Sequence, residues 1–413
     1  MLRQQPPARR PYNHLQKAIA KRFMCCAARK WNVWMVLAII AWTLQLSSAQ
    51  SPADNVVVIK LAAYGWQPPR AREIAGPSIA IDHKDRVLVG FTVRERNGLV
   101  TRNQPSLSFH IVRFSPEGKM DLSLSLPTNA AGTTGIYLSD TDQIIARANN
   151  NLQLLQSEAG NPQGGVWKIL APCTTQCLVK QSHSRHTLHL DRYGADQPGT
   201  LIRLSQEPVL QSCGKAHQFI KSPEDSIQNN PQSITDEFAY FAGSEGLEPF
   251  TYRWPHCDYE HRVELPLRVP GRWMVLNDKL LISTYASHTG HTGLEVLSSD
   301  GQVKFRPNLA KHESADSLWE PIRASERGDR MAVHIATMRG GNRTLDISSH
   351  LTARRIGVYD IDAGKEITSI PAKAKYHYRF AFDLSPDGHR LAIWEDDAVR
   401  VVALDDVGKT GVH

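Results

Sequence analysis

Two short stretches of the sequence concentrate histidines, the side chains best suited to transfer protons near neutral pH or to bind a metal ion. In "HSRHTLHLD", three histidines recur at intervals of three residues, and residues three apart on a strand point to opposite faces. His186 and His189 are therefore not expected to share a metal. In "SHTGHTG", His288 and His291 lie on a loop, where a ligand pair and an ordinary polar loop are alternatives.

Basic side chains gather in long polar segments at 94–107, 285–293 and 338–354 and in the stretch "PAKAKYHYR", which contain few acids. Arginine and lysine side chains in such loops can hold a carboxylate or a phosphate through charge and hydrogen bonds. Ordinary solvated loops are the alternative. The residues expected to bind an anionic ligand are Arg96, Arg102, Arg339, Arg343, Lys375 and Arg379.

Four cysteines follow residue 50. An even number in an exported chain favours two disulfides, and we expect Cys173 to pair with Cys177 and Cys213 to pair with Cys257. A zinc site is the alternative, because the spacing of the first two cysteines suits zinc, but the other two lie far apart. No metal and no cofactor is predicted.

Several catalytic motifs are missing from the sequence. It contains no Gly-x-Ser-x-Gly of a serine hydrolase, no phosphate-binding or dinucleotide-binding glycine pattern, and no Asp-rich calcium loop. An enzymatic site would have to be assembled from scattered residues. The first candidates for a base and a metal ligand are His288, His291 and Glu320.

The charge of the chain is unevenly distributed. The formal net charge is +7, but residues 1–49 contain eight basic residues and no acid, which leaves 40 basic against 41 acidic residues in the rest. A nearly neutral body argues against nucleic-acid binding. The basic stretch precedes an apolar run, "VWMVLAIIAWTLQL", and small residues up to Ala49. This order predicts a signal peptide over 1–49, cleaved after Ala49, and an exported protein, periplasmic or extracellular.

The leader leaves two alternatives open. The apolar run has 14 residues, short of the roughly 20 that span a bilayer, but an uncleaved signal anchor would tether the protein to the membrane. Met24 opens a stretch that would by itself be an ordinary leader, so we expect translation to start there.

From residue 77 onwards the sequence repeats short apolar alternations separated by polar turns. At seven points, 42 to 60 residues apart, a polar residue directly precedes a strand-like segment, and at five of them it follows an Asp. Further alternations, rich in β-branched and aromatic residues and bounded by Gly, Pro and Asp, complete each unit, which is typical of antiparallel strands. Most aromatic residues in these strands are expected in the core, among them Trp273, Trp319, Trp394 and Tyr359. The seven polar residues are Arg86, Gln143, His186, Glu237, Lys279, Arg330 and Arg390.

Four short strands per unit predict an all-β fold, a seven-bladed β-propeller that forms a single domain over 50–413. Six or eight blades are alternatives. The last unit has only three strands, so we expect "NVVVIKLA" at 55–62 to supply its fourth strand. Within that unit, Ser385-Pro-Asp-Gly is expected to form the first hairpin. Pro386 presets φ, the Ser385 hydroxyl caps the turn, and Gly388 ends it.

Residues 356–404 resemble the WD-repeat-like β-propeller family. The stretch "VYDIDAGKEITSI…FAFDLSPDGHRLAIWEDDAVRVVAL" follows its order of strand, glycine turn, strand, Ser-Pro-Asp-Gly turn, strand, acidic turn and strand. Over 75–355 the similarity is one of period only. Val402 and Ala403 stand where the family has its Trp-Asp pair, and no Gly-His dipeptide precedes the first strand. The resemblance implies architecture and a binding role, and no catalytic residue.

These observations predict an exported, non-enzymatic binding protein of the cell envelope that recognises an anionic protein or glycan. In a propeller, the loops from second to third strand and from blade to blade open on one face, and the basic residues named above lie in such loops. A propeller-type hydrolase or lyase is the alternative, and a purely architectural scaffold is a third reading. No nucleic-acid partner is expected, and a membrane contact only if the leader is retained.

Overall fold

The computed structural model describes the chain from residue 56 to residue 404 with gaps. The chain divides into two compact units, Met1–Asn55 and Val56–His413, and all described residues belong to the second. The predicted leader therefore lies outside them. In the described part, no helix is both long enough and apolar enough to cross a membrane. The gaps are 67–77, 95–106, 129–133, 158–164, 174–176, 193–199, 206, 213–232, 237, 244–245, 254–255, 263–271, 278–279, 287–291, 299–301, 311–312, 316–321, 339–350 and 374–379.

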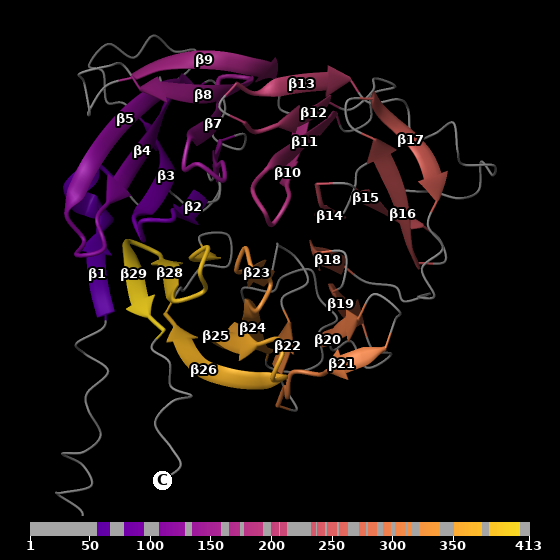
Figure 1. Ribbon diagram of the computed structural model, residues 1–413. Coiled ribbons are helices and arrows are strands. Elements are labelled where there is room, and N and C mark those ends of the chain that lie inside the picture. Colours follow the sequence, from indigo (N-terminus) through magenta and orange to yellow (C-terminus); the bar gives the residue numbers. More distant parts are fainter. Residues whose placement is uncertain are drawn as a thin grey trace, which may run out of the picture. The chain divides into compact units, whose positions relative to one another are not determined.

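The prediction of an all-β chain of short antiparallel strands is confirmed. The described strands form seven antiparallel sheets (Figure 1). We number the sheets 1 to 7 in chain order, beginning with the sheet that contains β2. Sheet 1 contains β2 (Ser78–Ile81), β3 (Val87–Arg94), β4 (Leu107–Phe114) and β5 (Met120–Thr128). Sheet 2 contains β6 (Gly135–Leu138), β7 (Ile144–Ala148), β8 (Asn151–Ser157) and β9 (Gly165–Pro172). Sheet 3 contains β10 (Cys177–Gln181), β11 (Thr187–Arg192), β12 (Thr200–Arg203) and β13 (Val209–Ser212).

The next sheets repeat this order of neighbouring strands. Sheet 4 contains β14 (Ser233–Ile234), β15 (Phe238–Gly243), β16 (Gly246–Arg253) and β17 (His256–Arg262). Sheet 5 contains β18 (Arg272–Asn277), β19 (Leu280–Ala286), β20 (Thr292–Ser298) and β21 (Val303–Phe305). In sheet 6 the first strand is in two pieces that both pair with the same neighbour. Its strands are β22 (Glu313–Ala315), β23 (Ile322–Ala324), β24 (Arg330–Met338), β25 (Leu351–Asp360) and β26 (Lys365–Ala372).

Sheet 7 joins the two ends of the described chain. Its strands are β27 (Phe380–Leu384), β28 (Arg390–Glu395), β29 (Ala398–Ala403) and β1 (Val56–Lys60). β1 pairs antiparallel with β29, with Val56 opposite Val402 and Lys60 opposite Ala398, so the indigo and yellow strands lie side by side in Figure 1. The N-terminal alternation thus completes a four-stranded sheet.

The apolar core lies between neighbouring sheets. The first strands touch across these junctions: β2 contacts both β6 and β27, β14 contacts β10 and β18, and β23 contacts β27. Sheets 2 and 3 are joined by a hydrogen bond from Gln181 Nε2 to the carbonyl of Leu138, at 2.5 Å, and by a shared apolar cluster. Sheet 5 contacts sheet 6 through β20 and β22. Trp394 and Tyr359, which the sequence placed in the core, are fully buried.

The chain after β1 enters the junction of sheets 7 and 1. A 3-10 helix, η2 (Leu61–Tyr64), ends at Gly65 in the left-handed region with φ 86°, and Trp66 follows. The Trp66 ring packs edge-on against Phe91 of sheet 1 and Trp394 of sheet 7, with ring centroids 5.4 and 5.0 Å apart. Both indole N–H groups donate to the carbonyl of Asp396. An aromatic cluster therefore ties the first sheet to the last.

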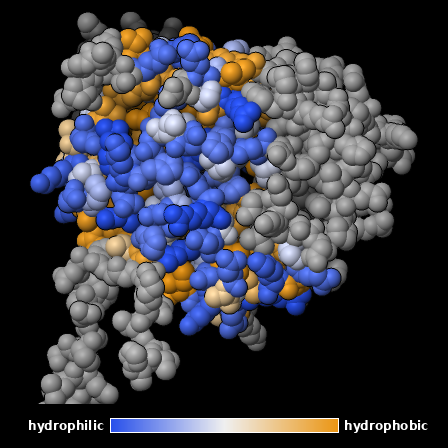
Figure 2. Space-filling model, in the orientation of Figure 1, coloured by the Kyte–Doolittle hydropathy of each residue, from blue (hydrophilic) through white to orange (hydrophobic). Residues whose placement is uncertain are grey.

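The surface differs between the middle and the margin of the view in Figure 2. Hydrophilic residues cover most of the described part of that face, and hydrophobic residues lie along its margin. Large apolar side chains that remain exposed lie mostly on the edge strand of a sheet. They include Val58, Met120, Val166, Ile169, Val209, Leu210 and Val303.

Candidate functional site

The turn between the first and second strand has the same backbone geometry in five sheets. In each, the fourth residue donates its N–H to the carbonyl of the first, at 2.8 to 3.0 Å, and has positive φ, between 59° and 76°. Only Gly, and less often Asn or Asp, adopts this conformation without much strain, which explains Asp85, Asp142, Gly328 and Gly388 at this position. We call these segments the inner turns: 82–86, 139–143, 182–187, 325–330 and 385–390.

In each inner turn, the side chain of the first residue accepts a hydrogen bond from a backbone N–H of the same turn. The Ser385 hydroxyl accepts a hydrogen bond from the Arg390 N–H at 2.8 Å, as the Ser-Pro-Asp-Gly sequence predicts. Asp82 does the same with a carboxylate, which accepts from the Arg86 N–H at 2.9 Å. Such local bonds satisfy backbone donors that no strand partner can reach. The middle residues of the turns are thus held in fixed positions, where they meet residues of other sheets.

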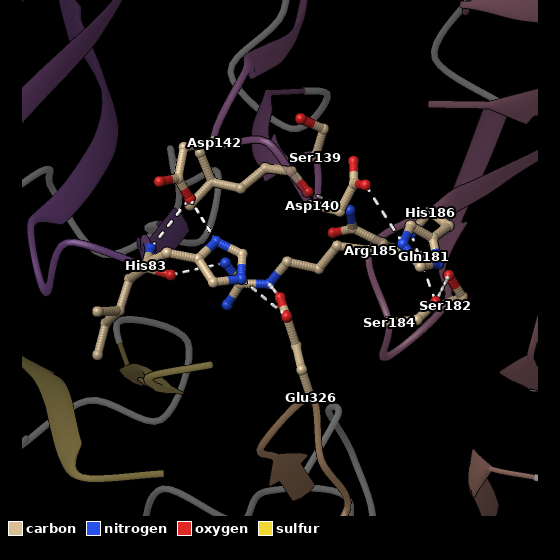
Figure 3. Close-up of polar contacts among 12 residues, drawn as sticks. His83, Ser139, Asp140, Asp142, Gln181, Ser182, Ser184, Arg185, His186 and Glu326 are labelled. Carbon is tan, nitrogen blue, oxygen red and sulfur yellow. Dashed lines mark hydrogen bonds and ion pairs between the residues drawn. The ribbon is translucent and has the colours of Figure 1, made fainter. Parts of the chain in front are cut away.

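His83, in the inner turn of sheet 1, contacts two other sheets (Figure 3). Its Nδ1 lies 2.8 Å from Oδ1 of Asp142 in sheet 2, and its Nε2 lies 2.8 Å from Oε2 of Glu326 in sheet 6. The His83 N–H also donates to Asp142, at 3.0 Å. Burial lowers the pKa of His83, but the hydrogen bonds with both carboxylates outweigh this, and the pKa lies above its usual value.

Arg185, in the inner turn of sheet 3, reaches groups in three other sheets. Its Nε lies 3.2 Å from Oε1 of Glu326, and one terminal nitrogen donates to the carbonyl of Ile81 at 2.7 Å. The other terminal nitrogen lies 3.8 Å from a carboxylate oxygen of Asp383 on β27. Only 11% of the Arg185 side chain is exposed. The guanidinium carries several N–H donors in a rigid plane, so one arginine can bind several acceptors at once.

The Asp383 carboxylate accepts a hydrogen bond from another strand and lies close to two arginine side chains. Its carboxylate accepts from the Ile81 N–H at 2.9 Å and lies 3.7 Å from Nε of Arg323. Burial raises the pKa of Asp383, and the charges of Arg185 and Arg323 act in the opposite direction. Asp383 thus joins β27 directly to the backbone of β2, at the junction of sheets 7 and 1.

His186 forms a second bridge of the same kind. Its Nδ1 lies 3.0 Å from Asp236 in sheet 4 and its Nε2 lies 3.2 Å from Asp140 in sheet 2. Asp236 also accepts from the hydroxyls of Ser184 and Thr187. Burial raises the pKa of Asp236, but these hydrogen bonds outweigh it, and the pKa lies below its usual value.

The polar groups of the inner turns mainly satisfy one another. The Ser184 hydroxyl is turned to Asp236 rather than to the His186 ring, so the trio lacks the serine-to-histidine bond of a nucleophilic triad. Within the described residues, no group of three or more His, Cys, Asp and Glu side chains is arranged to hold a metal ion. Six sheets contribute to the network, and its evident chemical effect is to bind them together.

The residues predicted to bind an anion lie outside the described part of the chain. This holds for Arg96, Arg102, Arg339, Arg343, Lys375 and Arg379, and for the enzymatic candidates His288, His291 and Glu320. Of the remaining predicted histidines, His186 lies on an inner turn and His189 is buried on β11.

The cysteines are described in part. Cys173 and Cys177 form a disulfide with Cα atoms 5.2 Å apart, and both are buried between sheets 2 and 3. Cys213 lies outside the described residues, and of Cys257 only the strand position, on β17, is described. The second predicted pair therefore stays a prediction.

Sequence reasoning missed the network of the inner turns. It concentrated on long loops, whereas His83, Asp142, Arg185 and Glu326 stand in turns of five or six residues. A usable signal was present, because the recurring polar positions mark the same turn in each unit. Aligning these turns would have shown charged residues at their middle positions. It would not have shown which turns meet.

No protein family and no curated protein matches this sequence. Among solved structures, the WD40 domain of SCAP from fission yeast aligns with 85% of this chain and 99% of its own, at 8% identity and a TM-score of 0.39. Hsv2 from Kluyveromyces lactis aligns with 68% of this chain and 78% of its own, at 13% identity and a TM-score of 0.37. The likeness to WD40 propellers is loose, and it assigns neither a family nor an activity to this chain.

Proposed function

We propose that this protein is a seven-bladed β-propeller, closed by β1, that acts as an exported, non-enzymatic interaction scaffold. The observation that carries the architecture is the order of contacts. Each sheet touches the next in sequence order, and β27 of sheet 7 touches β2 of sheet 1. Seven sheets with such contacts are what a closed ring of blades requires.

The proposed binding surface is the end of the sheets opposite the inner turns. In an antiparallel sheet, the connection from the second to the third strand leaves at the end opposite to the first hairpin. Residues 95–106 and 339–350 are such connections, and 373–379 link sheet 6 to sheet 7 at the same end. These segments are rich in arginine and lysine. The inner turns pair their charges internally, so the unpaired positive charge would lie at the loop end, suited to an anionic protein or glycan.

The proposal of export rests on the signal-like segment and on the disulfide. A signal-like segment over 1–49 precedes the sheets, and the buried Cys173–Cys177 disulfide is of a kind that persists in oxidising compartments. Whether the leader is cleaved determines whether the scaffold is free or tethered. Mass spectrometry of the N-terminus of the protein recovered from its producing cells decides between these two.

The test is binding of a polyanion to two matched triple variants, each expressed from the full coding sequence. Arg96→Ala, Arg102→Ala and Arg339→Ala remove three charges from the loop end. Lys84→Ala, Lys119→Ala and Arg327→Ala remove three exposed charges from hairpin turns at the other end. We expect heparin to raise the melting temperature of the wild type and of the second variant, less so at high salt, and not that of the first. Equal loss in both variants, or no shift in the wild type, would contradict the anionic-partner proposal.

A further inference from the structure

The His83 ring has a carboxylate on each nitrogen, and the three residues come from three sheets. Asp142 lies at 2.8 Å from Nδ1 and Glu326 at 2.8 Å from Nε2 (Figure 3). The side chain is 37% exposed, whereas Asp142 and Glu326 are 14% and 20% exposed. The ring can therefore exchange protons with solvent, while the two acids are largely shielded from it.

The chemistry of the three side chains makes this arrangement depend on a proton. A neutral imidazole has one N–H and one lone pair, whereas an imidazolium has two N–H groups. Ionised carboxylates only accept hydrogen bonds. Both 2.8 Å contacts are therefore hydrogen bonds only when His83 carries two protons. In the neutral ring, a lone pair would face a carboxylate oxygen at the same distance.

Most of the charged groups around His83 stabilise its protonated form. Asp142 faces it from the turn of sheet 2 and Glu326 from the turn of sheet 6. Arg185, from the turn of sheet 3, pairs with the other oxygen of Glu326, and its positive charge opposes protonation of His83. In the turn of His83 itself, Asp82 pairs with Arg86 and Asp85 pairs with Arg390 of sheet 7, while Lys84 is exposed. The two direct carboxylates outweigh burial, so that the pKa of His83 is raised.

We propose that His83 is a proton-dependent link between sheets 1, 2 and 6, which ties their inner turns when charged and releases one carboxylate when neutral. The direction of the effect follows from linkage. A group that binds its proton more tightly in the folded state stabilises that state below its unfolded pKa of 6.5. This stabilisation is lost as the pH rises through the folded pKa. The inner turns would thus be tightest in mildly acidic surroundings and loosest in alkaline ones.

The experiment follows the ring and the stability together. Full-length protein with isotope-labelled histidine is titrated by NMR from pH 5.5 to 9, and the melting temperature is measured over the same range. His83→Gln removes the titrating group. Asp142→Asn removes one charge but keeps an acceptor oxygen and a side chain that tolerates the φ of 61°. His389→Gln is the control, an exposed histidine of the equivalent turn of sheet 7 whose ring contacts Arg330.

We expect His83 to carry two protons at pH 6 and to titrate above free histidine, and its pKa to fall in Asp142→Asn. Between pH 6 and 8.5 the wild type and the His389→Gln control should lose on the order of 1–3 °C more in melting temperature than His83→Gln. A neutral ring at pH 6, or a His83 titration unchanged by Asp142→Asn, would overturn the proposal. Should His83→Gln fail to fold, the ring titration of the wild type against Asp142→Asn decides alone.

Discussion

Around Trp66, sheet 7 and sheet 1 are joined by apolar rings, whereas at the inner turns the sheets are joined by charged side chains. At the first junction, Trp66 is 3% exposed and Trp394 fully buried, and the polar atoms of both rings share one carbonyl. At the inner turns, Arg185 and His83 reach sheets that are not neighbours in sequence. Burial of aromatic surface gives a large stabilisation that involves no titrating group and no ion pair. Ion pairs contribute less to the free energy of unfolding, and their contribution depends on pH, on salt and on specific geometry.

The two regions therefore contribute to the stability of the sheets in different ways. The aromatic junction holds the first and last described strands together, and the inner turns set how the sheets sit at one end. A change at the junction should affect global stability. A change in the inner turns should alter how the stability depends on pH and on salt.

The largest effect is expected from Trp66→Ala. Removal of a buried ring between Phe91 and Trp394 leaves a cavity at the only described junction that contains the N-terminal strand. We expect the free energy of unfolding to fall by about 3–5 kcal/mol. Urea unfolding measures it, with Ile169→Ala, an exposed site on β9, as a control expected within about 0.5 kcal/mol of the wild type. A loss for Trp66→Ala that matches the control would mean that the aromatic junction does not hold the ends together.

A smaller effect is expected from Arg185→Ala. The substitution leaves Glu326 and Asp383 without one cation each, while the positive φ of 62° stays equally strained because alanine keeps the Cβ. We expect a loss of about 2–3 kcal/mol in the free energy of unfolding, reduced by high salt. Arg327→Ala, in an exposed position of another inner turn, is the matched control and should change little. If salt had the same effect on Arg185→Ala and Trp66→Ala, the contrast between the two regions would fail.

In acid, the strand histidine His189 and the turn histidine His83 should change the stability in opposite directions. Burial on β11 lowers the pKa of His189 to about 4. Below pH 6.5 the unfolded chain binds a proton at this residue that the folded chain does not, so stability falls as the pH drops towards 4. At pH 5 the loss should be about 2 kcal/mol. His189→Leu should flatten this part of the pH profile in urea unfolding, and an unchanged slope would show that His189 is not the group responsible.

Much of the fold could be predicted because its signals are local. The alternation in "RLAIWE" marks a strand, and Ser385-Pro-Asp-Gly marks the hairpin before it, as the Ser385 and Gly388 hydrogen bonds show. Burial of Trp394 and Tyr359 follows from their place in such strands. The asparagine pair at Asn149 and Asn150 forms a tight turn with positive φ that residue type alone makes plausible.

The inner-turn network could not be predicted, because its partners are far apart along the chain. His83 and Glu326 are separated by 243 positions, and Ile81 and Asp383 by 302. Each residue alone looks like an ordinary polar turn residue. The histidines of "HSRHTLHLD", at 183, 186 and 189, divide between the inner turn of sheet 3 and the buried strand β11.

By itself, the sequence predicted an all-β chain of short antiparallel strands and their hairpins, since turn chemistry and alternating hydrophobicity act between near neighbours. It also predicted that the alternation at 55–62 supplies the missing strand of the last unit, and it places the excess positive charge in residues 1–49. Only the tertiary structure decided which turns face each other, that Arg185 reaches three other sheets, and that His83 lies between two carboxylates. Such contacts depend on how whole sheets pack, and no local pattern encodes that packing.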